Sequence, residues 1–377
     1  MAILEPDTQW LFPLSAFQHT PSWELTRVGL DYELKERVKG VEFIFRVAAQ
    51  LKLGIPVFSA ASQYFHRFYM RYSVAEYTRQ DVAAASLFLA CKTEEHSRKL
   101  KDVAYICFSK ATGETDENSP EIPRWQKTIL ATEEVLLEAL CFDFIVDHPH
   151  AELASLLLHE RRGELLEQYA WTIVTDSLRT PLCLLQPGRI IAAGCFILAE
   201  KLFDGPNSAS LDERIFSRPS ASLPTPPHLY AQSPKSDNAA QMFFNLSDED
   251  MEAVAVTITM LLDLYSAFAA MDENFSHLSP ITEVSRPSLS TPYQTVYTPD
   301  PRTQANNENN GDMNDGAFTP ASMARTPSHH FGGETQTSTA PSTPSVQHGT
   351  TTPKEPPAPE PAQIPKPPQR GPLLDLS

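Results

Sequence analysis

The chain has 377 residues, 41% of them hydrophobic, and its 47 Asp and Glu residues outnumber 30 Lys and Arg residues to give a net charge of −17. This acidity argues against a protein whose main task is to hold nucleic-acid phosphates, because that task needs clustered basic side chains. The start of the chain has no basic stretch, and no run of 18 apolar residues occurs, so we expect a soluble protein without a membrane partner.

Hydrophobic periodicity predicts five helices in the first part of the chain. Pro56 suits the first turn of the second helix. The third helix is small or apolar on all its faces from Val82 to Cys91, so it has to be buried among the others. The five helices are expected at about residues 31–53, 57–71, 78–95, 99–111 and 122–140.

A second set of apolar helices follows Pro149. The last of them begins with the capping box Ser247-Asp248-Glu249-Asp250. An insertion rich in Ser, Pro and Asn at about residues 204–241 is too polar to bury a core, and we expect it to be disordered. The chain is therefore predicted to be all-α, with two successive helical lobes. The helices of the second lobe are expected at about residues 150–160, 164–179, 187–202 and 247–269.

From about residue 273 to residue 377 the composition changes to Pro, Thr, Ser, Gln and Asn, which predicts a disordered tail. Several Ser and Thr residues of the tail and the insertion precede a proline. The simpler explanation is that these residues are abundant in such linkers, and the alternative is that a proline-directed kinase phosphorylates them. These candidate phosphorylation sites are Ser233, Ser279, Thr291, Thr298, Thr319, Thr326, Thr343 and Thr352.

The sequence carries no motif of an enzyme active site that we recognise. It has no phosphate-binding glycine loop, no HExxH, no GxSxG and no kinase-type catalytic loop. Its five cysteines fall in apolar helical stretches without the short spacings of zinc or redox motifs, which indicates core positions in a reducing compartment. We therefore expect no catalytic residue, no cofactor and no metal.

Two charged residues stand out because each lies on an apolar helix. Lys92 ends the buried third helix, and Glu133 falls in the apolar face of the fifth. A carboxylate in such a face is costly unless it is paired or hydrogen-bonded. One explanation is an internal Lys92–Glu133 bridge or a lysine that reaches water, and the other is a partner-binding surface. The apolar face is predicted to contain Ile129, Leu130, Leu136, Leu137 and Leu140.

Several segments resemble the cyclin boxes of the transcriptional cyclins, types K and T. Three segments resemble the first cyclin box, namely residues 64–70, 84–95 and 98–102. Three others resemble the second box of cyclin K, namely residues 169–178, 190–193 and 261–266. The resemblance covers about residues 24–270. It implies an N-terminal extension at 1–23, a first, kinase-binding cyclin box at 24–146, a second box with the insertion at 147–272, and the tail at 273–377.

The resemblance implies a non-catalytic regulatory subunit that binds and activates a cyclin-dependent protein kinase. With the composition of the tail, it points to the fungal cyclin subunits of kinases that phosphorylate the C-terminal domain of RNA polymerase II. This implies a nuclear protein in transcription elongation, with the polymerase as the kinase's substrate and room for a third subunit in the complex. Matching motif to motif assigns kinase contacts to Lys92, Glu95, Glu133 and Phe142.

The sequence also allows other functions for a protein with a cyclin fold. The proline that usually follows the Glu-Glu pair is replaced by His96, and no strong basic RNA-recognition motif of the cyclin T kind is visible. The alternatives are a cyclin of type L or C serving a splicing-linked or Mediator kinase, and a DNA-binding general transcription factor with a cyclin fold. The acidic charge and the lack of a CxxC pair disfavour the DNA-binding alternative, so we expect no strong direct nucleic-acid binding.

Overall fold

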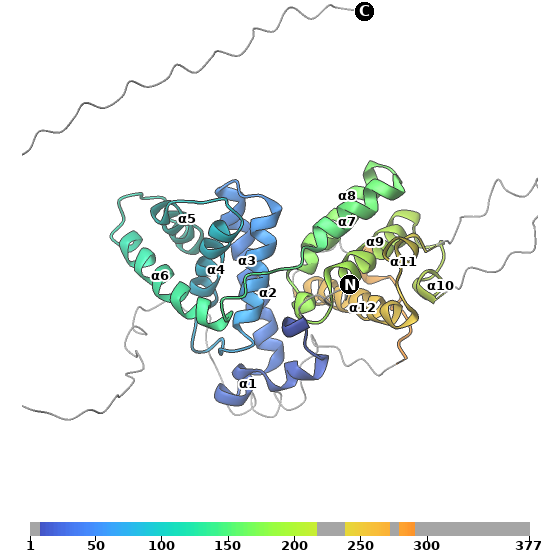
Figure 1. Ribbon diagram of the computed structural model, residues 1–377, viewed down its shortest axis with the longest axis horizontal. Helices are drawn as coiled ribbons and strands as arrows, with labels where there is room; N and C mark the ends of the chain where they lie inside the picture. Colours follow the sequence, from blue (N-terminus) through green and yellow to red (C-terminus); the bar gives the residue numbers. More distant parts are fainter. Residues whose placement is uncertain (1–7, 217–237, 272–278, 291–377) are drawn as a thin grey trace, which may run out of the picture. The chain divides into compact units, whose positions relative to one another are not determined.

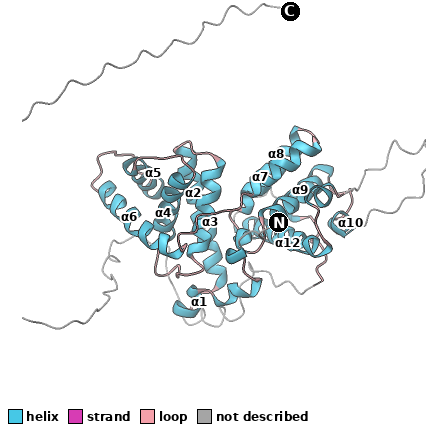
Figure 2. Cartoon of the chain, viewed as in Figure 1, coloured by secondary structure: helices cyan, strands magenta, loops and turns pink. Residues whose placement is uncertain are grey.

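The computed structural model describes residues 8–216, 238–271 and 279–290, and every regular element in these ranges is a helix (Figures 1 and 2). The expected all-α class is therefore confirmed for the described residues. The first lobe contains α2 (Leu30–Gln50), α3 (Ile55–Phe68), α4 (Arg79–Thr93), α5 (Leu100–Thr112) and α6 (Glu121–Ala139). The long helices of the second lobe are α7 (Pro149–Glu160), α8 (Glu164–Ser177), α9 (Gly188–Asp204) and α12 (Asp248–Met271).

Seven shorter helices complete the described part of the chain, and the sequence patterns did not predict them. Three of them precede the first lobe, and the others lie in or after the second. They are η1 (Thr8–Trp10), η2 (Leu14–His19), α1 (Pro21–Thr26), η3 (Pro181–Leu184), α10 (Leu211–Phe216), α11 (Ala239–Phe244) and α13 (Ser279–Thr282).

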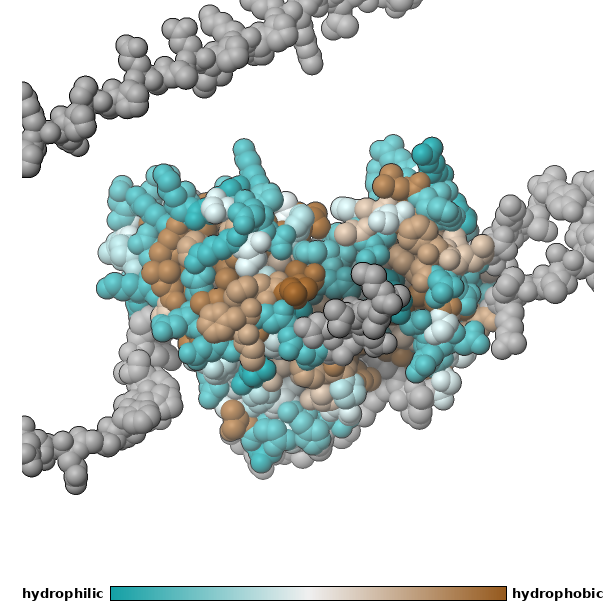
Figure 3. Space-filling view, viewed as in Figure 1, coloured by the Kyte–Doolittle hydropathy of each residue, from teal (hydrophilic) through white to brown (hydrophobic). Residues whose placement is uncertain are grey.

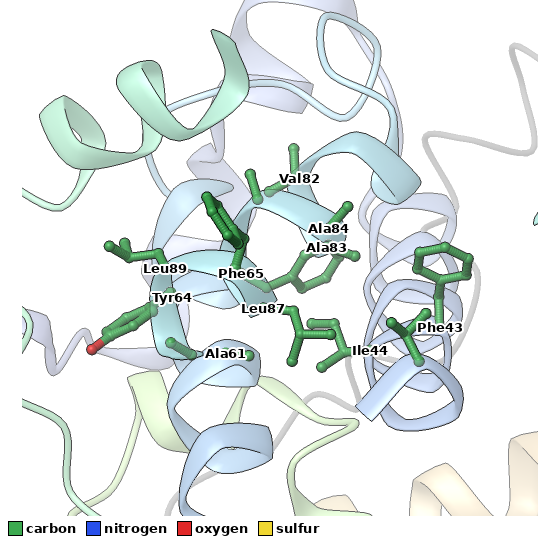
Figure 4. Close-up of a cluster of buried hydrophobic side chains, with 14 of the residues drawn as sticks. Phe43, Ile44, Ala61, Tyr64, Phe65, Val82, Ala83, Ala84, Leu87 and Leu89 are labelled. Atoms are coloured by element: carbon green, nitrogen blue, oxygen red, sulfur yellow. The ribbon is translucent and has the colours of Figure 1, made fainter. Parts of the chain in front are cut away.

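Helix α4 is the buried axis of the first lobe, as its composition predicted. Every residue from Val82 to Cys91 is buried, and α4 packs against α2, α3 and α6. Its alanines allow neighbouring helices to come close, and Figure 4 shows side chains of α2 and α3 gathered around it. Gly40 of α2 is needed for this packing, because an added Cβ would lie only 2.0 Å from the ring of Phe65.

A fully buried ion pair lies between the first lobe and the described residues that precede it, 8–26, which we call the N-terminal segment. Arg37 donates to Glu33 through Nε at 2.8 Å, and neither side chain is exposed. Its Nη1 also donates to the backbone carbonyl of His66 at 2.8 Å, and Thr20 donates to Glu33 at 2.6 Å. The guanidinium lies 6.0 Å from the ring centre of Phe17. One charge network therefore joins residues 17–20 to α2 and α3.

Further hydrogen bonds connect the first lobe to the segment that follows α8. The Nε2 of His66 donates to the carbonyl of Leu178 at 2.9 Å, because its Nδ1 faces the Arg37 guanidinium. Arg179 reaches back to Glu42 of α2 at 2.8 Å. His66 is thus a buried, hydrogen-bonded residue of the core.

The second lobe repeats the plan of a buried central helix. The residues from Ile190 to Ala199 of α9 are buried, and α9 packs against α7, α8 and α12. The predicted capping box of α12 is confirmed: Ser247 accepts from the Asp250 amide at 3.1 Å, and Asp250 accepts from the Ser247 amide at 3.0 Å. Residues 248–269 are long and apolar enough to cross a membrane, but 67% of that stretch is buried, as expected for a core helix.

Two residues of the first lobe that the sequence predicted to be buried are exposed. Leu130 is 48% exposed rather than part of the apolar face of α6, because it lies about 100° around the helix from the buried Ile129. Cys141 is exposed rather than in the core, because α6 ends before it and the chain turns there.

The expected disorder is wrong for parts of the insertion and the tail. Within the insertion, α10 buries Leu211 and Ile215, and α11 begins at Ala239. In the tail, Ile281, Val284 and Leu289 pack against the second-lobe core. A few well-placed apolar side chains therefore order segments whose overall composition is polar.

One of the candidate phosphorylation sites lies within the described residues. Ser279 is the first residue of α13. The others lie outside the described residues: Ser233, Thr291, Thr298, Thr319, Thr326, Thr343 and Thr352.

We predict that the protein loses stability as the pH falls below about 6.5, partly because of His66. Burial, followed by the nearby Arg37 charge, lowers the pKa of His66 to about 3 from an ordinary value of 6.5. Between these pH values only the unfolded chain binds the proton, so the free energy of unfolding falls by up to about 1.4 kcal/mol per pH unit.

Urea unfolding at pH 7 and pH 5 would measure this loss in the natural chain and in His66→Gln, whose amide can still donate to Leu178. The loss should be smaller in the variant. Burial also lowers the pKa of His150 to about 4, so part of the pH dependence should remain. Equal losses in the two proteins would contradict the assignment to His66.

Candidate functional site

Lys92 and Glu133 form an ion pair between α4 and α6. The Lys92 Nζ lies 2.7 Å and 2.8 Å from the two carboxylate oxygens of Glu133. The side chain of Glu133 is only 9% exposed, whereas that of Lys92 is 47% exposed. The ammonium also lies 4.2 Å from the ring centre of Phe88, one turn earlier in α4. The internal bridge, one of the two explanations from the sequence, is therefore present, with one side of its cation open to solvent.

Glu95 lies at the C-terminal end of α4 in a left-handed backbone conformation. The amides of Glu95 and His96 bond back to the carbonyls of Lys92 at 3.3 Å and Cys91 at 2.9 Å, which is the Schellman pattern of a helix end. Glycine usually occupies such a position, but here Glu95 has a φ of 56°. The turn presents the exposed Glu95 carboxylate three residues after Lys92.

Helix α6 ends in the same way. The amides of Cys141 and Phe142 bond to the carbonyls of Glu138 at 3.0 Å and Leu137 at 3.1 Å. Cys141 and Phe142 have φ values of 52° and 57°, a region that disfavours bulky residues by about 1 kcal/mol each. The side chain of Phe142 is nevertheless 64% exposed. Strained, exposed residues of this kind suggest a role in binding rather than in packing.

The turn after α6 is held in place through Asp143. This carboxylate accepts hydrogen bonds from Trp10 at 2.8 Å, from the Ile145 amide at 3.1 Å and from Gln9. Burial alone would raise the pKa of Asp143, but these hydrogen bonds and the charge of Arg67 outweigh burial and lower it. The Arg67 guanidinium also lies 4.9 Å from the ring centre of Trp10. The N-terminal segment therefore fixes the loop that carries Phe142.

Helix α3 supports the same loop from the core. The Tyr64 hydroxyl donates to the Phe144 carbonyl at 2.9 Å, and burial raises the pKa of Tyr64 so that it stays a neutral donor. The ring of Phe144 lies 6.4 Å from that of Phe142 in an edge-to-face arrangement. Phe142 thus projects from a loop whose backbone is fixed on two sides.

The structure brings two of the four predicted site residues into contact and places the other two at helix ends. Lys92 and Glu133 pair directly, Glu95 follows the end of α4, and Phe142 follows the end of α6. Sequence reasoning missed the supporting residues Trp10 and Asp143, because their contact joins segments that lie far apart in the sequence. On the face in Figure 3, hydrophobic side chains reach the surface between hydrophilic ones over both lobes. In the ranges that the structure describes, no group of three His, Cys, Asp or Glu side chains is placed to hold a metal ion.

Comparison with known proteins gives relatives of one family. The model of the cyclin N-terminal domain matches residues 15–145. Cyclin pch1 of Schizosaccharomyces pombe is 41% identical over 197 residues, which are 51% of this chain and 57% of pch1. Human cyclin-K is 33% identical over 197 residues, which are 51% of this chain and 33% of cyclin-K. The chain thus spans between a third and just over half of the length of these two curated relatives.

A solved structure shares the fold of the chain. The crystal structure of the yeast RNA Pol II CTD kinase CTDK-1 complex contains a chain with a TM-score of 0.53 and 17% identity. The match covers 82% of this chain and 86% of that one, so both lobes lie within the shared fold. The model match identifies a cyclin N-terminal domain at residues 15–145, and the two relatives are similar to this chain over about half of its length.

Proposed function

We propose that this chain acts as a cyclin: it binds and activates a cyclin-dependent protein kinase that phosphorylates the C-terminal domain of RNA polymerase II, and so promotes transcription elongation. The observation that carries the proposal is the Lys92–Glu133 pair, whose ammonium is half open to solvent at the end of the buried helix α4. The likeness to pch1 and cyclin-K supports a cyclin role, and the resemblance of the sequence motifs to the transcriptional cyclins supports the choice of kinase class.

The four predicted residues supply complementary parts of a protein-binding surface. Lys92 keeps donor capacity on its exposed side while Glu133 neutralises it on the other, so the ammonium can bridge a second carboxylate from the kinase. Glu95 adds an exposed negative charge, and Phe142 adds an exposed aromatic ring of the kind that anchors interfaces. Charges fix the orientation of the partner, and the ring contributes buried area.

Activation follows from preferential binding to one state of the kinase. A cyclin that binds the active arrangement of the kinase's regulatory helix more tightly than the inactive one makes the active arrangement the dominant state. The internal Lys-Glu pair of the kinase then forms, and the catalytic groups all belong to the kinase. The cyclin acts as a rigid template and needs neither a catalytic group nor a cofactor of its own.

The same proposal assigns roles along the chain. The first cyclin box, at 24–146, binds the kinase after the extension at 1–23. The second box, at 147–272, forms the other lobe, and the rest of the chain to residue 377 lies outside the kinase contact. The protein works in the nucleus with the kinase, the polymerase is the kinase's substrate, and a third subunit can join the complex.

We predict that exchanging the two charges of the Lys92–Glu133 pair separates folding from kinase binding. Lys92→Glu alone places two carboxylates together and should lower both stability and binding. Adding Glu133→Lys restores an internal ion pair, so the circular dichroism melt should return toward that of the natural chain. Kinase binding should remain weaker than that of the natural chain by roughly 2–5 kcal/mol, because the charge offered to the kinase is inverted. Pull-down titration with the kinase subunit measures this.

A matched control for Lys92→Glu is Lys101→Glu on the exposed face of α5, which changes the net charge as Lys92→Glu alone does, whereas the exchanged pair leaves the net charge unchanged. Lys101→Glu should leave both the melt and the kinase affinity unchanged. If the exchanged pair recovered full kinase binding along with its stability, the pair would act only as an internal bridge.

We predict that Phe142→Ala weakens kinase binding without destabilising the fold. The ring is largely exposed, so the free energy of unfolding should change by no more than about 0.5 kcal/mol. Loss of an aromatic anchor should weaken kinase binding by roughly 2 kcal/mol. Leu158→Ala, at a 74% exposed position on α7, is the control and should bind normally. Normal kinase binding by Phe142→Ala would remove this residue from the proposed surface.

A further inference from the structure

Residues 281–290, which we call the second-lobe strap, are fastened to the second lobe by two serines. Ser288 donates to Asp212 of α10 twice, from its amide at 2.6 Å and from its hydroxyl at 3.1 Å. Ser290 donates to Glu252 of α12 twice, from its amide at 2.6 Å and from its hydroxyl at 2.8 Å. Each serine therefore gives all its donors to one carboxylate, and both serines are exposed to solvent.

The strap also covers charge and apolar surface of the second lobe. Arg286 donates to the buried Asp263 of α12 through Nε at 2.8 Å and lies within 2.6 Å of it through Nη2. Ile281, Val284 and Leu289 pack against the second-lobe core. The strap thus joins α10 to α12, neutralises a buried carboxylate and shields apolar side chains.

We propose that Ser288 and Ser290 are phosphorylation sites and that phosphate on either one releases the strap. A protein kinase would transfer the γ-phosphoryl group of ATP to the serine Oγ, which loses its proton, and ADP would leave. The hydroxyl donor is then replaced by a group with a charge of about −1.5 to −2 and only acceptor oxygens facing the carboxylate. Asp212 or Glu252 changes from an acceptor into a repelling neighbour.

The two attachment points make the strap sensitive to a single phosphate. Each serine contributes two hydrogen bonds to a carboxylate, and such charge-assisted bonds are the stronger kind. Once one serine is repelled, Arg286 is drawn from Asp263 and leaves that buried carboxylate unpaired. Release would therefore uncover apolar surface on α12 and free α10 from its tie, a regulatory step independent of the kinase-facing first lobe.

The experiment is hydrogen–deuterium exchange on the full chain carrying phosphoserine at position 288 through an expanded genetic code. Exchange of the amides in 281–290 should become roughly 10- to 100-fold faster than in the unmodified protein, because hydrogen bonds to charged acceptors are lost. Ser288→Ala keeps the amide bond to Asp212 and should change the exchange only a few-fold. Phosphoserine at position 290 should act as at 288, with Ser290→Ala as its control.

The charge mechanism is tested by repeating the measurement with Asp212→Lys. In that variant the phosphate meets an ammonium, so phosphoserine at 288 should slow the exchange of the strap instead of accelerating it. Unchanged exchange in the phosphorylated natural chain, or release by Ser288→Ala as complete as by phosphate, would overturn the proposal. Phosphopeptide mapping of the protein from its own cells should find phosphate on Ser288 or Ser290, and only unmodified peptides would overturn their assignment as sites.

Discussion

The fold depends on the complete satisfaction of one buried charge, the guanidinium of Arg37. An unpaired charge in a protein interior costs several kcal/mol, so every group that completes its environment is constrained. Glu33 neutralises it, Thr20 fixes that carboxylate, and the backbone of α3 accepts a further hydrogen bond. The neighbouring His66 carries the constraint on to the carbonyl of Leu178. A single cation thereby coordinates the N-terminal segment, the first lobe and the start of the segment beyond α8.

The sequence was most informative where the free-energy cost of burying a residue depends on its neighbours in the same helix. The continuous apolar run of α4 allows no position but a buried one, and the observed helix agrees with that expectation. A carboxylate within an apolar face demands a partner, and that demand correctly singled out Glu133 and Lys92. What the sequence could not decide is whether the pair serves the fold alone or also a kinase, because both require the same two residues at the same spacing.

The sequence was least informative where a contact joins distant segments. Glu33 and Arg37 have the spacing of an ordinary surface pair on a helix, and only the N-terminal segment that covers them makes the pair buried. Trp10 and Asp143 are unremarkable until the chain brings them together. The second-lobe strap has the composition of a linker, and its order comes from a few apolar contacts and from carboxylates that belong to helices earlier in the sequence.

The N-terminal segment has a consequence for the order of folding during synthesis. Trp10 leaves the ribosome first, yet its partner Asp143 is 133 residues away, and the Phe12 amide bonds to the carbonyl of Leu184 at 2.7 Å. At about 5–20 residues per second, the wait for Asp143 is roughly 7–27 s. During that time the first lobe can gather its local helix contacts, but the segment that covers Arg37 cannot be fully fastened. Chaperones would therefore meet a nascent chain whose first-lobe helices are formed and whose residues around Trp10 and Phe12 still lack their final partners.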